Sequence, residues 1–261
     1  MTTWEFPAPE PISLEARLPA GDITVSAEDV TTATVSLTPA RPGKRGEELI
    51  AGTTVEFDGG KLTVIVPDRL RLLSSTSLDL VVRLPRGSSC QLKAASADIR
   101  CTGELGSLDA RSASGDVSVE QVTGAVTINT ASGDVRLKDA AAAVQVNTAS
   151  GDTDIGRAGG EVSLNSASGD VTVSRAEGSV KARSASGDVR ISSITAGRGE
   201  ISTVSGDISV AVPGGIGVYL DLSAVSGDVR SDLEPTGSDG DAGLTLQCRS
   251  ISGDVRVSRA G

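Results

Sequence analysis

The sequence contains no histidine and very few aromatic residues. Its 261 residues include one tryptophan, one tyrosine and two phenylalanines. Histidine is the commonest general base and the commonest metal ligand, so its absence removes the usual means of activating a serine or holding a catalytic metal. We therefore expect no catalytic residues, and a core made of aliphatic side chains.

Basic clusters and long apolar runs are also missing. The chain has 24 Lys and Arg residues against 34 Asp and Glu residues, a formal net charge of −10. Nucleic-acid binding depends on neutralising phosphates, so this balance argues against DNA or RNA. No apolar run approaches about 18 residues, and the first ~30 residues hold no apolar signal core. We expect no nucleic-acid partner, no direct membrane insertion and a cytoplasmic location.

Only three cysteines are present, Cys90, Cys101 and Cys248, and none belongs to a Cys-x-x-Cys pair. An odd number of cysteines without metal-binding spacing is typical of reduced thiols in a cytosolic protein. We predict that they are small buried side chains. A disulfide between Cys90 and Cys101 in adjacent coils is the alternative.

What the sequence does contain is a nine-residue repeat from Gly115 to Ser186. Two nines make the true period, because Ser-Gly-Asp returns every 18 residues. The repeated aspartates are Asp98, Asp116, Asp134, Asp152, Asp170 and Asp188, followed at wider steps by Asp207, Asp228 and Asp254. Similarity at a fixed period indicates stacked units, each of which buries a face that its neighbour covers.

Positions three and five of each nine are apolar with a polar residue between them, as in Val117-Ser118-Val119. This alternation is the period of a β-strand. The sequence therefore predicts an all-β fold, a single-stranded-coil β-solenoid (β-helix) with 18-residue coils and two short strands per coil. An antiparallel meander of hairpins is the alternative. Parallel coils are favoured because only they align matching residues as ladders.

Position eight of the nines is small and is predicted to tuck under the bend of its coil. These residues are Val122, Ala131, Ala140, Ala149, Ala158, Ala167, Ala176 and Ala185. Polar residues recur beside the Ser-Gly-Asp bend, where stacked amides and hydroxyls can hydrogen-bond from coil to coil. The predicted turn ladder consists of Asn129, Asn147, Asn165, Ser132, Ser150, Ser168 and Ser186. The opposite bend is irregular, either because nothing constrains it or because it meets a partner.

The two ends of the chain depart from the repeat. Residues 1–90 are predicted to form a less regular β cap with early coils, and residues 91–261 one continuous rod of regular coils. The cap strands are expected at Ile12–Leu18, Asp22–Ser26, Ala33–Thr38, Thr54–Phe57, Lys61–Val66 and Leu78–Leu84, with a polar loop over Pro39–Gly52. Asp254–Gly261 is too short to cover a last coil, which predicts a homodimer through the C-terminal coil.

The aspartate ladder is the strongest candidate for chemistry. Carboxylates stacked about 5 Å apart repel each other by roughly 1 kcal/mol in water. Either each carboxylate accepts hydrogen bonds from backbone N–H groups of its turn, or calcium lies between the coils. The candidate calcium ladder is Asp116, Asp134, Asp152, Asp170 and Asp188. Calcium-binding glycine-rich repeats have more glycines and oxygen ligands per turn, so the turn role is favoured.

Two weaker patterns involve carboxylates. An acidic loop with Asp232, Glu234, Asp239 and Asp241 lacks the ordered ligand spacing of an EF-hand, which favours a solvated loop. Carboxylates on a β-helix face can also cleave polysaccharides. Here the acids are periodic and the repeat has almost no aromatic platform for a sugar, so a non-catalytic face is favoured.

The Ser-Gly-Asp-Val/Ile repeats resemble those of the bacterial DUF4097 putative-adhesin family. Leu84-Pro85-Arg86-Gly87 and Val212-Pro213-Gly214-Gly215, each preceding a strand, add to this resemblance, which covers roughly residues 80–258. It implies a β-solenoid that is often exported or attached to a membrane segment, an adhesin role and no catalytic residues.

Together, these patterns predict a non-catalytic scaffold or protein-interaction module with no cofactor and an unidentified protein partner. One alternative is a self-assembling structural protein, either dimeric or filament-forming. The other is a calcium-stiffened surface adhesin.

Overall fold

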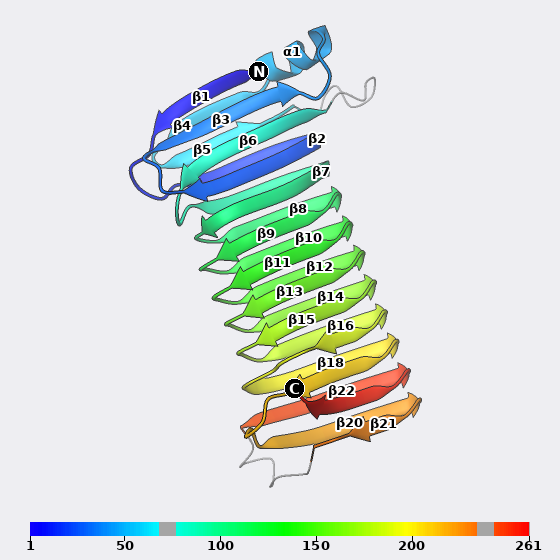
Figure 1. The fold of residues 1–261 in the computed structure, drawn as a ribbon. Coiled ribbons are helices and arrows are strands. Elements are labelled where there is room, and N and C mark those ends of the chain that lie inside the picture. Colours follow the sequence, from blue (N-terminus) through cyan, green and yellow to red (C-terminus); the bar gives the residue numbers. More distant parts are fainter. Residues whose placement is uncertain (68–76, 234–242, 261) are drawn as a thin grey trace. The chain divides into compact units, whose positions relative to one another are not determined.

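A computed structural model describes residues 1–67, 77–233 and 243–260 (Figure 1). Their regular secondary structure is almost entirely β-strand, and the chain divides into two compact units, Met1–Gly133 and Asp134–Gly261. In the described part of the chain, no helix has the length and apolar character needed to cross a membrane. The fold is the predicted all-β solenoid. The predicted boundary at residue 90 stays a prediction.

The first unit consists of two stacked layers of strands that share two long members. Its strands are β1 (Thr2–Pro7), β2 (Ser13–Glu28), β3 (Thr32–Pro39), β4 (Thr54–Asp58), β5 (Lys61–Ile65), β6 (Leu78–Pro85), β7 (Ser89–Leu105), β8 (Leu108–Ser114), β9 (Val117–Val122) and β10 (Val126–Ser132). Strands β2 and β7 run parallel from Ser13↔Ser89 to Ala27↔Gly103. The first half of β2 pairs with β5 and the second half with β6, so these long strands pass from one layer to the other.

The predicted cap strands are confirmed, with two of them joined in β2. The N-terminal β1 was not predicted. It pairs antiparallel with β3, which pairs antiparallel with β6. These antiparallel pairs differ from the parallel coils that follow, which explains why the cap lacks the nine-residue pattern.

The predicted loop over Pro39–Gly52 is wrong, because Lys44–Ala51 forms helix α1. Its buried residues are Gly46, Leu49 and Ile50, which are spaced at three and four residues and therefore share one helix face. Charged residues surround this short apolar stripe and made the segment read as polar.

The second unit is built from short parallel strands. They are β11 (Val135–Ala140), β12 (Val144–Ser150), β13 (Thr153–Ala158), β14 (Val162–Ser168), β15 (Val171–Ala176), β16 (Val180–Ser186), β17 (Val189–Ile191), β18 (Gly197–Ser205), β19 (Ile208–Val212), β20 (Val218–Ser226), β21 (Val229–Ser231), β22 (Leu244–Ser252) and β23 (Val255–Arg259). As far as β19, every second strand pairs in register, for example Val144↔Val162 and Val162↔Val180. The 18-residue coil with two strands is thus confirmed.

The position-eight prediction is correct at one bend and wrong at the other. Val122, Ala140, Ala158 and Ala176 are buried. Their counterparts beside Ser-Gly-Asp are exposed, namely Ala131, Ala149, Ala167 and Ala185. There the strand continues to the serine, so its alternation buries position seven and turns position eight outward. Thr130, Thr148, Ser166 and Ser184 take the buried place.

The last coils of the second unit are stacked out of chain order. β22 pairs with β18 on one side and with β20 on the other. In the second layer, β23 pairs with β19 and β21. The expectation that Asp254–Gly261 forms the open end is therefore wrong, because the coil of β20 and β21 takes the outer place (Figure 1). Whether the protein dimerises stays a prediction.

Burial accounts for this order. The inward residues of the inserted coil are Leu244, Leu246, Cys248, Val255 and Val257, all 0% exposed. The outer coil instead places Ser231 in register with Val257. Burying apolar surface stabilises the fold more than burying a serine does, so the coil with the more apolar inward residues lies inside the stack.

Candidate functional site

Each Ser-Gly-Asp corner requires a glycine. Gly187 has φ +138°, and a Cβ there would lie 2.2 Å from the Gly169 carbonyl oxygen of the preceding coil. Gly253 has φ +144° and a corresponding distance of 2.1 Å to the Gly206 oxygen. No other residue type fits this conformation and approach. The corners therefore hold successive aspartates at the same height in each coil.

The aspartates form a hydrogen-bonded ladder. Asp188 N–H donates to Asp170 Oδ1 at 2.8 Å, so each carboxylate accepts the backbone N–H of the next aspartate in the stack. In the second unit the bond recurs at Asp152→Asp134, Asp170→Asp152, Asp207→Asp188, Asp254→Asp207 and Asp228→Asp254. In the first unit, Asp116 donates to Asp98 at 2.9 Å. Hydrogen bonding to the charged form offsets the repulsion between neighbouring carboxylates.

The structure also bears on the calcium alternative. Among residues 1–67, 77–233 and 243–260, no three His, Cys, Asp or Glu side chains are grouped so as to hold a metal ion. The ladder aspartates instead use one carboxylate oxygen on backbone N–H groups. Of the predicted acidic loop, Asp232 is described, whereas Glu234, Asp239 and Asp241 lie outside the described residues.

The predicted amide and hydroxyl ladder divides into two kinds of side chain. Asn165 Nδ2 donates to Asn147 Oδ1 at 2.9 Å across adjacent coils. In the first unit, Asn129 stands in register with Arg111. The serine side chains are exposed, at Ser132, Ser150, Ser168 and Ser186.

The buried hydroxyls at position seven were missed. Thr148 Oγ1 donates to the Ser150 carbonyl oxygen at 3.0 Å, and Ser166 Oγ donates to the Ser168 oxygen at 3.2 Å. These bonds satisfy the carbonyls where the chain turns. The available signal was the strand alternation, which continues through position seven.

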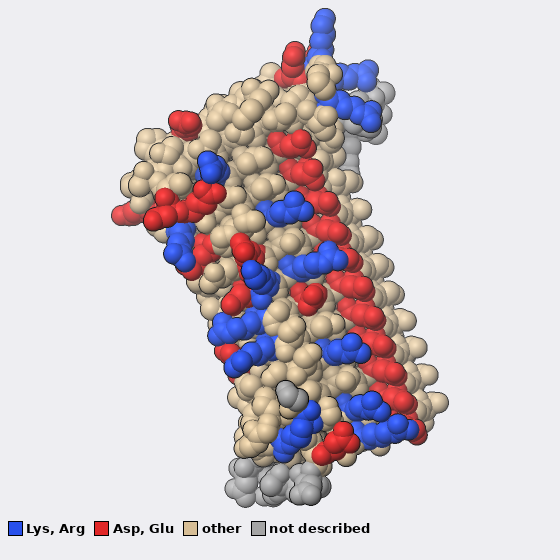
Figure 2. Space-filling model, in the orientation of Figure 1, with Lys and Arg blue, Asp and Glu red and all other residues tan. Residues whose placement is uncertain are grey.

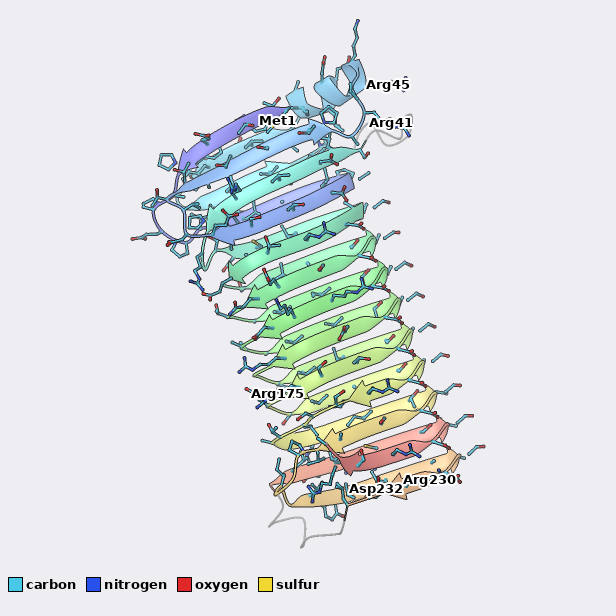
Figure 3. The ribbon with its side chains drawn as sticks, viewed as in Figure 1. Met1, Arg41, Arg45, Arg175, Arg230 and Asp232 are labelled. Carbon is cyan, nitrogen blue, oxygen red and sulfur yellow. The ribbon has the colours of Figure 1, made fainter. Side chains whose placement is uncertain are left out.

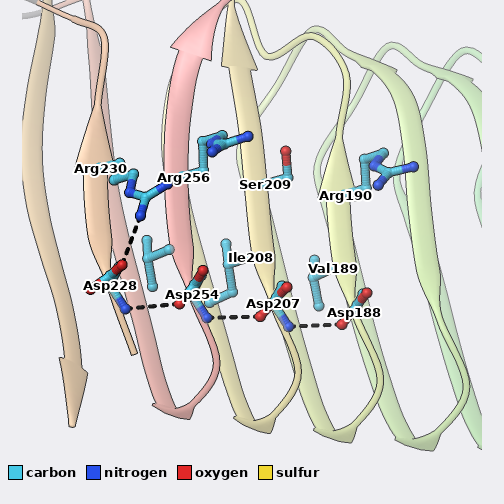
Figure 4. A pocket seen from close by; sticks show the side chains of 11 residues that line it. Asp188, Val189, Arg190, Asp207, Ile208, Ser209, Asp228, Arg230, Asp254 and Arg256 are labelled. Atoms are coloured by element: carbon cyan, nitrogen blue, oxygen red, sulfur yellow. Dashed lines mark hydrogen bonds and ion pairs between the residues drawn. The ribbon is translucent and has the colours of Figure 1, made fainter. Parts of the chain in front are cut away.

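A shallow groove in the second unit combines both charges. Its volume is about 220 Å³, and one wall carries the carboxylates of Asp188, Asp207, Asp254 and Asp228 (Figure 4). Two residues further along each strand, the other wall carries Arg190, Ser209, Arg256 and Arg230. Figure 2 shows the carboxylates as a red line with separate blue side chains beside it.

The arginines of the groove differ in their pairing. Arg230 Nη2 lies 2.8 Å from Asp228 Oδ2 in the outer coil, where Figure 3 labels Arg230. Arg190 and Arg256 form no hydrogen bond or ion pair with any described residue. A free guanidinium presents planar paired donors that fit a carboxylate. Neither arginine was predicted as a site residue, and the longer spacing of the last coils hid the register of Arg256.

The irregular bend on the other edge carries an ion-pair cluster. Arg157 lies 3.1 Å from Asp139 and 2.8 Å from Glu177, and Arg175 pairs with the same glutamate at 3.1 Å. Hydrogen bonding from Arg157 lowers the pKa of the Glu177 carboxyl. Arg175 lies at the bend of its coil (Figure 3). The cluster is already internally neutralised, so it offers less to a partner than the groove does.

Two other features could carry chemistry. In the first unit, an open cavity of about 600 Å³ is lined by Trp4, Pro39, Pro42 and Ile50 among others. The three cysteines are free and buried, as predicted. Burial raises the pKa of Cys101 and Cys248 to about 12. Because the thiolate is the reactive form, neither thiol is a nucleophile near neutral pH.

Comparisons with known proteins extend over almost the whole chain. The family described as Toastrack DUF4097 matches residues 12–258. A solved "putative adhesin" from Bacteroides fragilis NCTC 9343 is 11% identical, with 98% of this chain and 96% of that chain covered and a TM-score of 0.42. A "putative lipid binding protein" from Parabacteroides distasonis ATCC 8503 is 15% identical, with 98% and 96% covered and a TM-score of 0.43. No curated protein matches the chain. Because the family match spans residues 12–258, the chain belongs to the Toastrack DUF4097 family.

Proposed function

We propose that this protein is a non-catalytic β-solenoid scaffold whose charged groove binds a protein partner. The partner would present acidic side chains to Arg190 and Arg256. The ladder aspartates form the opposite wall of the groove. The proposal retains the cytoplasmic location predicted from the sequence.

The observation that carries the proposal is that two guanidinium groups, those of Arg190 and Arg256, lie at fixed strand positions and pair with no residue that the structure describes. Arg190 pairs in register with Ser209, and Ser209 with Arg256, so the two arginines lie two strands apart. Parallel strands are about 4.8 Å apart, which places the Cα atoms of the two arginines roughly 10 Å from each other. Because the strands fix the backbone positions of both arginines, binding orders only their side chains, which favours specific recognition.

The scaffold role is also supported by the state of the side chains that most often act in catalysis. The sequence has no histidine. All three cysteines are buried with free thiols. The ladder carboxylates accept backbone hydrogen bonds. A binding function uses the observed surface without requiring any of these groups to react.

The test is a pull-down with the full chain and with the double variant Arg190→Ala/Arg256→Ala. The matched control is Arg175→Ala, which removes an arginine from the opposite bend. We expect a protein that is retained by the original chain and by the control, is lost with the double variant, and is released as salt rises. Equal retention by all three proteins would contradict the assignment of the groove.

A further inference from the structure

The outermost strand of the second unit has unused backbone groups. Among the described residues β20 pairs with β22 alone. Leu244 N–H donates to the Gly217 carbonyl oxygen at 3.2 Å, and Leu244 stands in register with Val218. In a parallel ladder this pattern repeats every two residues, so the odd-numbered residues of β20 bond to β22. The N–H and C=O groups of the even-numbered residues point away from β22, at Val218, Leu220, Leu222 and Ala224.

The side chains of this outer coil are incompletely covered. Leu220 and Leu222 are half-buried, whereas their register partners Leu246 and Cys248 in β22 are 0% exposed. Val229 of β21 is 44% exposed, whereas its partner Val255 is 0% exposed. The aliphatic core of the unit is thus open at this coil.

Apolar surface also increases toward the same end. At position eight beside Ser-Gly-Asp, the inner coils expose alanine. The last three coils in the stack expose Val204, Ile251 and Val225, at 51%, 53% and 83%. An apolar stripe that widens toward an open strand edge is typical of an interaction surface.

The edge lacks the usual protection against pairing. Exposed edge strands commonly carry lysine or proline to prevent association. β20 has the sequence VYLDLSAVS, with neither residue and with Asp221 as its one charge. The described residues therefore leave this edge open to a further strand.

We propose that a second copy of this chain pairs antiparallel with β20 about a two-fold axis at Leu222. In this register, Leu222 faces Leu222 of the partner subunit and Leu220 faces Ala224 of the partner subunit, so large and small side chains alternate inside. Asp221 then faces Ser223 of the partner subunit. A shift that centres the axis on Asp221 sets two carboxylates directly opposite each other, which is unfavourable.

The self-complementarity of β20 indicates that the strand added at this edge is β20 of a second copy. With a two-fold axis at Leu222, the outward N–H groups of the even-numbered residues donate to the outward C=O groups of the partner subunit, and the reverse. Leu222 is also the central residue of the nine in β20, so the two paired strands would overlap over their full length. The C-terminal coil itself remains between β18 and β20 and does not exchange.

The first test is sedimentation velocity of the full chain over a concentration series, together with Leu222→Pro. Proline removes an N–H that points away from β22, so the ladder within the subunit is kept. We expect a concentration-dependent dimer for the original chain. We expect about a thirtyfold weaker dimer for Leu222→Pro, from two lost backbone hydrogen bonds. A monomer throughout the series, or an unchanged dimer of the variant, would overturn the proposal.

A cross-linking experiment tests the register without relying on proline. Cys248 is the register partner of Leu222 in β22, so every variant also carries Cys248→Ser, which prevents a disulfide within one subunit. Leu222→Cys then places two thiols across the axis, where Cα atoms of a hydrogen-bonded antiparallel pair are about 5.5 Å apart and can form a disulfide. Under mild oxidation this variant is expected to give a covalent dimer. Ser223→Cys and Thr172→Cys, the register and surface controls, are expected to remain monomeric on denaturing gels. Cross-linking of Ser223→Cys in place of Leu222→Cys would refute the two-fold axis at Leu222.

Discussion

At the residue scale, the corner glycines set how closely successive coils approach. The carbonyl oxygen of one corner occupies the space where the next corner would place a Cβ, as at Gly169 and Gly187. The close stacking of the coils and the hydrogen bonds between the aspartates therefore both require that the corner residue has no Cβ. The sequence already indicated this requirement, because glycine precedes every ladder aspartate except Asp98.

Replacing Gly187 with alanine is expected to destabilise the protein by about 2–4 kcal/mol, since the new Cβ would collide with backbone and strain a positive φ. Gly214→Ala is the matched control, because Gly214 has no atom within 4 Å of a Cβ and does not have a positive φ. Chemical denaturation of both variants measures the difference. Similar midpoints for the two variants would show that the corner can relax.

The buried residue at each bend could be predicted only in part. Apolar positions three and five identified the strands, and small residues suggested what lies under a bend. At the Ser-Gly-Asp corner a buried hydroxyl replaces the expected alanine, as at Thr148 beside Ala149. The reason is geometric, since the strand extends to Ser150 and keeps its alternation. Composition alone does not show where a strand ends.

At the element scale, coil order is the main departure from expectation. Sequential stacking is the default for a repeat protein. Here the connection from β19 to β20 passes the inserted coil, and Arg259 at the end of β23 holds that connection. Its Nη1 donates to the carbonyl oxygens of Pro213 at 3.0 Å and Ile216 at 3.2 Å. Hydrogen bonds from Arg259 thus stabilise the loop that leads into the outer coil.

Arg259→Met is expected to lower the free energy of unfolding by about 1–2 kcal/mol, because two charge-assisted hydrogen bonds at an exposed site are lost. Arg256→Met, on the same strand, removes an arginine that has no described partner and should change stability by less than about 0.5 kcal/mol. Urea denaturation compares the two. An equal effect would mean that Arg259 does not fasten the connection.

Inspection of the inward residues could have predicted the coil order. Ser231 ends an inward row that is apolar in the neighbouring coil, which marks β21 as the less buried strand. The helix α1 carried a weaker signal, since one turn of apolar residues among charges does not distinguish a helix from a loop. The groove could not be predicted without the order of the coils, because Arg256 lies next to Ser209, and therefore two strands from Arg190, only after insertion.

At the scale of the whole molecule, buried thiols report on each unit separately. Cys90 and Cys101 lie in β7 of the first unit and Cys248 lies in β22 of the second. Burial raises the pKa of all three thiols above the ordinary value. Unfolded thiols ionise at lower pH than the buried ones. The free energy of unfolding that the buried thiols contribute is therefore present at neutral pH and is lost as pH rises from the ordinary pKa of 9.0 to about 12.

Thiol-reactive dye at pH 8 is therefore expected to label none of the cysteines in the native protein. With increasing denaturant, Cys248 should react first, because only β20 lies between β22 and the open edge. Strand β7 lies deeper, since its neighbours β2 and β8 each pair with a further strand. Mass spectrometry of the labelled peptides gives the order. Earlier labelling of Cys90 or Cys101 would show that the open coil is not where unfolding begins.

The inserted coil has a consequence for how the protein is made. A ribosome releases residues 218–231 before residues 244–259, so β20 emerges while its final neighbour β22 is still unsynthesised. Until β22 is made, β18 has a free edge on which β20 can dock directly, whereas in the finished fold β22 lies between these two strands. Translation supplies only about 5–20 residues per second, which gives that early arrangement time to form. The completed neighbour order therefore depends on the arrival of the final segment, and a prematurely terminated chain differs in connectivity as well as in length.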